Sequence, residues 1–193
     1  DVLISSVGGT LTTSGIDHET DRIVAPGLRV FGVEFGEDPL FPFAAFDPGF
    51  QSSLTDTSIT LNLYAGLGLW NGAGFDAAPV ELFMSYGPYL AGTGSGGSAV
   101  FTFEDDLHVH PDFFLDESGG VPGAGIYLAA FNVSADGYQS SETFWVVFNL
   151  GMSEEDHEAA IEWTESNLVP APGALALLGL VMASRSARSR RRD

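Results

Sequence analysis

The chain has 193 residues with a hydrophobic content of 45% and no cysteine, which is enough apolar material for one domain of ordinary size. All but one of its 26 acidic residues lie in residues 1–169, where the only basic side chains are Arg22 and Arg29. So acidic a body repels phosphate backbones, which excludes nucleic acid as a partner. Without cysteine, the chain has no disulfide and no thiol nucleophile, and any transition-metal site must use His, Asp and Glu.

The chain opens with "DVLISSVGGT", which contains neither the basic n-region nor the apolar h-region of an export signal. We expect Asp1 to be the N-terminus that remains after such a signal has been removed. A shortened chain would begin in the same way.

Short alternating or apolar runs separated by Gly, Pro and Asp predict strands rather than helices. The run at 142–150 is apolar on both faces, as expected of a central strand that is covered on each side. The pattern therefore predicts an all-β fold, an antiparallel β-sandwich of the jelly-roll or Ig-like kind, over residues 1–168. Its expected strands are 28–35, 58–65, 79–85, 98–104, 106–115, 125–134 and 142–150.

One helix is predicted at the end of this domain, over residues 153–168. Ser153 is a favourable N-cap, and three acidic residues follow it where the helix dipole stabilises negative charge. Pro170 and Pro172 end the helix. His157 lies one turn before Ile161, so we expect it to pack at the helix start rather than bind a ligand. The apolar stripe comprises Ala160, Ile161, Thr164 and Leu168.

The best candidate for chemistry is the strand predicted at 106–115. Its alternation places His108, His110 and Asp112 on one face. Imidazole and carboxylate groups bind zinc and similar divalent ions, so these residues are candidate ligands, and His18 in an acidic loop is a further one. Pro111 lacks an N–H and fits an edge strand or a bulge, which would change the alternation. Two solvent-facing histidines on an edge strand are the alternative interpretation.

The last part of the chain differs in character from the acidic body. Pro170-Ala171-Pro172 precedes eleven small or apolar residues, 173–183, and a basic cluster. Eleven helical residues cover about 17 Å, less than the ~30 Å of a bilayer core. A basic cluster after an apolar run nonetheless favours retention of the chain end on the cytoplasmic side of a membrane. The cluster comprises Arg185, Arg188, Arg190, Arg191 and Arg192.

This segment, 169–193, resembles a PEP-CTERM sorting signal in the variant found in planctomycete proteins, with Ala171 where the commonest form has Glu. The resemblance implies export, transient membrane anchoring and cleavage near the Pro-Ala-Pro motif by an exosortase. The body resembles the uncharacterised domains that carry such signals. The His-x-His strand, with Gly125 and Tyr127 after it, resembles surface-anchored domains associated with metal uptake.

These observations predict an exported protein of the cell envelope, cell surface or extracellular space that is not an enzyme. The first hypothesis is a domain that binds a divalent cation, zinc by preference. The alternatives are a structural or adhesive matrix protein without metal and, more weakly, a hydrolase or binding module for extracellular polysaccharide, in which Trp70 or Trp163 stacks on a sugar.

Overall fold

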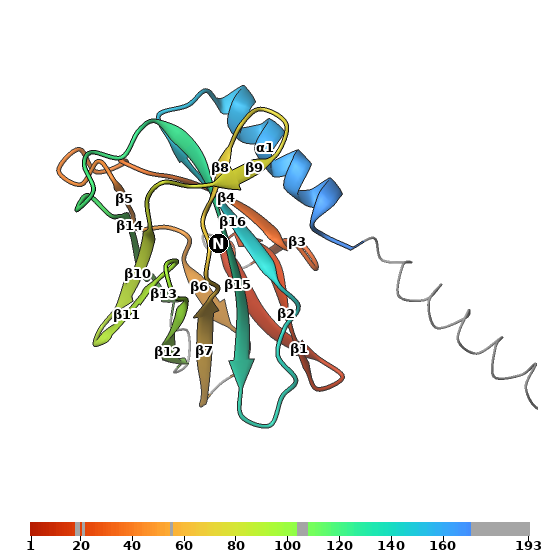
Figure 1. The fold of residues 1–193 in the computed structure, drawn as a ribbon. Coiled ribbons are helices and arrows are strands. Elements are labelled where there is room, and N and C mark those ends of the chain that lie inside the picture. Colours follow the sequence, from red (N-terminus) through yellow and green to blue (C-terminus); the bar gives the residue numbers. More distant parts are fainter. Residues whose placement is uncertain (18–19, 21, 55, 104–107, 171–193) are drawn as a thin grey trace, which may run out of the picture.

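The computed structural model describes residues 1–17, 20, 22–54, 56–103 and 108–170, with the backbone alone at 102 and 103. Strands predominate, and one helix, α1 (Glu154–Asn167), follows the last of them. Three sheets and the helix form the layers seen in Figure 1. The predicted all-β, sandwich-like class with a C-terminal helix is therefore confirmed.

The largest sheet has the order β12-β7-β15-β16-β4, with the short β8–β9 hairpin attached to β15. Its pairs are antiparallel except β16–β4, which is parallel. Strand β16 lies between two neighbours and is almost entirely buried, as predicted for residues 142–150. The bounds are β4 Val30–Glu34, β7 Thr57–Leu63, β8 Gly68–Trp70, β9 Phe75–Ala77, β12 Gly97–Phe103, β15 Gly125–Ala135 and β16 Phe144–Leu150.

Two smaller sheets complete the strand framework. One has the order β13-β6-β1-β2-β3, in which β1 and β6 run parallel. Its strands are β1 Val2–Val7, β2 Thr10–Asp17, β3 Arg22–Ala25, β6 Phe50–Ser52 and β13 His108–Val109. The other has the order β11-β10-β14-β5, with β5 Ala44–Ala45, β10 Leu82–Tyr86, β11 Tyr89–Gly92 and β14 Asp112–Leu115.

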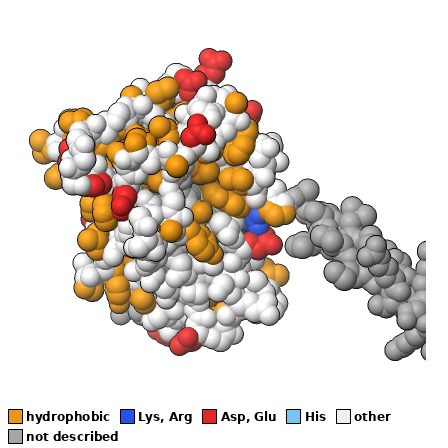
Figure 2. All heavy atoms as spheres, in the orientation of Figure 1, with side chains coloured by type: hydrophobic (Ala, Val, Ile, Leu, Met, Phe, Trp, Pro, Cys, Tyr) orange, Lys and Arg blue, Asp and Glu red, His pale blue; other side chains and the backbone are white. Residues whose placement is uncertain are grey.

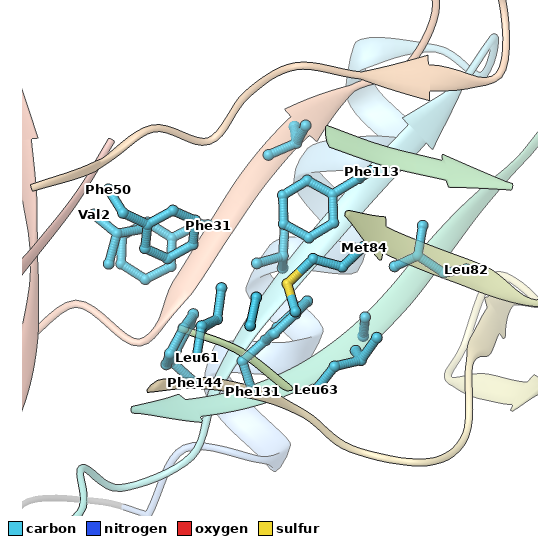
Figure 3. Packing of buried hydrophobic residues seen from close by; sticks show 14 of the residues in the cluster. Val2, Phe31, Phe50, Leu61, Leu63, Leu82, Met84, Phe113, Phe131 and Phe144 are labelled. Atoms are coloured by element: carbon cyan, nitrogen blue, oxygen red, sulfur yellow. The ribbon is translucent and has the colours of Figure 1, made fainter. Parts of the chain in front are cut away.

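Phenylalanine side chains join the two smaller sheets to one face of the large sheet. Phe50 of β6 contacts Phe101 of β12 and Phe144 of β16, at ring-centroid distances of 6.3 and 6.5 Å. Phe113 of β14 contacts Phe131 of β15 at 5.9 Å. All five rings are fully buried, and most are visible in Figure 3 with the aliphatic side chains that fill the space around them. The buried phenylalanine rings thus form the core that holds the three sheets together.

Helix α1 covers the opposite face of the large sheet, near β4 and β16 (Figure 1). Its N-cap is Ser153, whose side chain accepts the backbone N–H of Asp156 at 3.2 Å, as predicted. A second, smaller apolar cluster lies below the helix and comprises Val30, Ile126, Val147 and Ala160. No helix among the described residues has the length and apolar character needed to cross a membrane.

One strand prediction was wrong in detail. Residues 106–115 do not form one continuous strand, because the chain leaves β13 after Val109 and enters β14 of another sheet at Asp112. Pro111 stands between them, and its missing N–H removes a donor that a continuing ladder would need. His108 and Asp112 therefore belong to different sheets.

Candidate functional site

The two histidines of the His-x-His sequence lie side by side at the edge of the five-stranded sheet. Strand β13 pairs with β6 so that His108 is opposite Gln51. The imidazole rings of His108 and His110 have centroids 4.4 Å apart and are tilted by 47°. The side chains are 22% and 43% exposed, respectively, so His110 is the more open to solvent, and Nε2 of His108 is itself buried. The two imidazoles lie close together as expected, but the predicted common strand face with Asp112 is not formed, because Asp112 lies on β14.

The carboxylate of Asp1 faces His108. Nε2 of His108 lies 3.7 Å from Oδ2 of Asp1, and the other carboxylate oxygen of Asp1 accepts the backbone N–H of Gly49 at 2.9 Å. Gly49 also provides the space that the imidazole occupies, because a Cβ at this position would overlap Nε2 of His108. The segment that leads into β6 thus positions both groups.

His110 faces the same segment from the other side. Its Nδ1 lies 2.9 Å from the carbonyl oxygen of Phe46 and 3.3 Å from Oδ1 of Asp47. A carbonyl oxygen only accepts hydrogen bonds, so Nδ1 carries the proton in this contact. In the neutral ring, Nε2 is then the nitrogen with a lone pair available to a cation. This is the arrangement that orients many metal-binding histidines.

The other predicted ligands do not join this pair in the described structure. Asp112 is exposed and lies on β14, at an open cavity of about 610 Å³. That cavity is otherwise largely apolar and is lined mainly by Leu40, Phe41, Phe43, Phe46 and Phe114. His18 lies outside the described residues, as do Ala171, Pro172 and the arginines of the tail; Pro170 is exposed after α1. The role of His18 and the sorting signal remain predictions.

A second histidine–carboxylate group was missed by the sequence reasoning. Within the described ranges, one set of three ligand-type side chains has its potential ligand atoms within 4.8 Å of one another, namely Glu34, Glu154 and His157. His157 is buried at the helix start, as predicted, but it lies against Glu34 of β4. No local pattern points to this contact, because Glu34 is more than a hundred residues away in the chain. Asp1 and Asp47 were missed because they too are distant in the chain from the histidines that they contact.

The tryptophans proposed as sugar platforms have a packing role. The rings of Trp70 on β8 and Trp163 on α1 have centroids 6.0 Å apart, and both contact Phe75 on β9. These three partly buried rings attach the β8–β9 hairpin to the helix. On the face in Figure 2, hydrophobic side chains reach the surface between scattered acidic ones.

Two residues elsewhere show how burial acts on the few strong bases and phenols of this fold. Arg29 is paired with Glu142 and lies 5.6 Å from the ring centre of Trp145, and desolvation lowers the pKa of its guanidinium. Desolvation likewise raises the pKa of the Tyr127 phenol. Neither residue belongs to the paired-histidine site.

Comparison with family models, with curated proteins and with solved structures finds no match to this chain.

Proposed function

We propose that this chain is the cation-binding domain of an exported cell-surface or extracellular protein, with His108 and His110 as paired ligands for a divalent ion such as zinc. The observation that carries the proposal is the 4.4 Å separation of the two imidazole rings, each of which faces a carboxylate. Neutral imidazole with carboxylate oxygen is the ligand chemistry of zinc and its first-row neighbours. Binding, rather than catalysis, is the proposed activity.

The surroundings of the pair support this assignment. Nδ1 of His110 is occupied by the Phe46 carbonyl, which leaves Nε2 as its ligand atom. Asp1 and Asp47 supply negative charge, and the acidic body raises the local concentration of cations around both rings. The resemblance of residues 169–193 to a sorting signal supports export, an exosortase as the processing partner, and transient contact with the membrane.

The experiment is a zinc titration of the full chain by calorimetry in 150 mM NaCl, with His108→Ala/His110→Ala beside the wild type. We expect the double variant to bind one zinc ion fewer per chain. Zinc at a hundred times its dissociation constant should stabilise the wild type at this site by about 2.7 kcal/mol, and this increment should be missing from the variant. Gln51→Ala, which changes the residue opposite His108 on β6 but keeps both imidazoles, should retain the full stoichiometry.

Equal stoichiometry in wild type and double variant would refute the paired-histidine site. If weak binding then disappears as salt is added, it comes from diffuse acidic charge. The working function would become that of a structural or adhesive matrix protein, for which extracellular polysaccharide is the partner to test.

A further inference from the structure

We infer that Glu34, Glu154 and His157 form a second divalent-cation site, distinct from the paired histidines, between the first turn of α1 and the edge of the large sheet. Their potential ligand atoms lie within 4.8 Å of one another. Glu34 is the last residue of β4, and the other two residues belong to the first turn of the helix. An ion here would join the helix to the sheet.

The hydrogen bond of His157 selects the nitrogen that faces the carboxylates. Nε2 lies 2.9 Å from the carbonyl oxygen of Val147, which only accepts, so Nε2 carries a proton. Nδ1 is directed at Oε1 of Glu34, 3.0 Å away. In the neutral ring, Nδ1 of His157 and Oε1 of Glu34 both present lone pairs, which repel each other. A positive charge between the two atoms is required to make this contact favourable. Two ligands at about 2.1 Å from one ion lie about 3.0 Å apart at an octahedral angle and about 3.4 Å apart at a tetrahedral one. The observed spacing is therefore at the short end of the range for a shared cation.

The charge of the group suits a divalent ion. A divalent ion with two carboxylates and a neutral imidazole gives a neutral set. The helix itself carries six acidic residues and no Lys or Arg, so its own sequence supplies no alternative cation other than a protonated His157. Glu154 and Glu158 are four residues apart, and like charges at this spacing destabilise a helix. An ion bound to Glu154 would reduce this repulsion.

Neighbouring residues hold Glu34 and His157 in place without an ion. Nδ2 of Asn149, the register partner of Glu34 on β16, donates to Oε1 of Glu34 at 3.2 Å. Asn149 is buried and is itself fixed by the backbone N–H and C=O of Met152. Gly32 gives the imidazole its space, because a Cβ there would lie 3.2 Å from Cε1 of His157. Such outer contacts orient ligands in metal sites.

The ligand set indicates the class of ion. One imidazole nitrogen with two carboxylates suits zinc and other first-row divalent ions, whereas calcium prefers a larger set of oxygen ligands. Glu154 is exposed, so the site is open to solvent on the helix side and water would complete the coordination. Zinc is therefore the probe, with calcium as the comparison ion.

The test uses the full chain with His108→Ala/His110→Ala, so that the proposed paired-histidine site is absent. Glu154→Gln and Glu155→Gln are then added separately. Both replace an exposed first-turn carboxylate and change the charge equally, but only Glu154 belongs to the group. Zinc binding is followed by calorimetry and by tryptophan fluorescence, since Trp163 on α1 packs against Trp70 on the sheet side.

We expect one zinc ion per chain in the double-histidine background, a fluorescence change on binding, and no comparable response to calcium. Glu154→Gln should weaken zinc binding by at least about tenfold, while Glu155→Gln should change it by less than about twofold. Absence of zinc binding in this background, or equal effects of the two substitutions, would overturn the second site and leave the paired-histidine proposal standing. Far-UV circular dichroism of each variant verifies that α1 is still formed.

Discussion

The phenol of Tyr127 is the clearest case in which a single buried group links the fold to pH. It lies on β15 with 2% of its surface exposed and donates its hydroxyl hydrogen to the carbonyl oxygen of Gly123 at 2.7 Å. Desolvation raises its pKa above the ordinary value of about 10. Above that ordinary value the unfolded chain releases the proton while the folded chain retains it, so stability is lost as the pH rises toward the folded pKa.

Tyr127→Phe should therefore remove part of the alkaline loss of stability. The measurement is the free energy of unfolding in urea at pH 8 and pH 11. At pH 8 the variant should be less stable by about 1 kcal/mol, because it lacks one hydrogen bond; its further loss at pH 11 should be smaller than that of the wild type. Tyr89→Phe, which changes an exposed phenol, serves as the control and should follow the wild type. Parallel losses in all three proteins would contradict the argument.

At this scale the sequence predicted residues whose roles depend on near neighbours. The closeness of His108 and His110 was predicted from their spacing of two, although β13 ends before His110. The N-cap role of Ser153 was predicted from the residues just after it. The contact between Glu34 and His157 depends instead on how a strand and a helix far apart in the chain meet. No local spacing encodes that contact. The packing of His157 at the helix start was therefore predicted, and its partner Glu34 was missed.

Helix α1 is attached to the sheet at a position where β4 has no side chain. A Cβ at Gly32 would lie 2.8 Å from Cδ1 of Ile161 and 3.2 Å from Cε1 of His157, so the helix would have to move outward. Gly32→Ala should lower the free energy of unfolding by about 1–3 kcal/mol, the usual cost of overpacking. Urea unfolding measures this. Gly119→Ala, where a Cβ meets nothing within 4 Å, should change stability by less than about 0.5 kcal/mol, and an equal effect of both would refute the close-contact explanation.

Most of the long strands and the helix were predicted, whereas the shortest strands were not. β5, β8 and β9 have only two or three residues, too few to show a period. The β1–β2 hairpin was missed although a signal exists: Gly8 and Gly9 both have positive φ, as a two-residue hairpin turn requires. Pro111 marks the place where the expected strand changes sheet, which shows that proline outweighed the alternating pattern there.

For the whole molecule, the proposed sorting route makes a prediction about the finished chain. When the full chain is exported from a bacterium that has an exosortase, the product should lack the residues beyond the Pro-Ala-Pro motif at 170–172. The basic cluster is expected to retain the chain end at the cytoplasmic face long enough for cleavage. Replacement of all five tail arginines by Gln should leave the C-terminus uncleaved. Intact mass spectrometry reads the difference, and a wild-type product that still ends at Asp193 would contradict the route.

The arrangement of the three sheets could not be predicted from the sequence. Periodicity indicates that a strand has a buried face, but it carries no information about which strand pairs with which. The parallel pairs β1–β6 and β4–β16 join segments that are far apart in the chain, and both interrupt an otherwise antiparallel pattern. Composition and alternation therefore predicted the all-β class. The order of the strands and the arrangement of the three sheets depend on long-range packing.

The pairing of β4 with β16 sets the earliest time during synthesis at which the large sheet can be completed. Glu34 meets Asn149, 115 positions later, and α1 packs on the surface that these two strands create. At 5–20 residues per second, a ribosome takes roughly ten seconds to make the intervening chain. Until then β4 has no partner in its sheet and the helix has no surface on which to dock. This edge of the large sheet thus stays incomplete until most of the chain has been synthesised, although strands such as β1 and β2 can pair earlier.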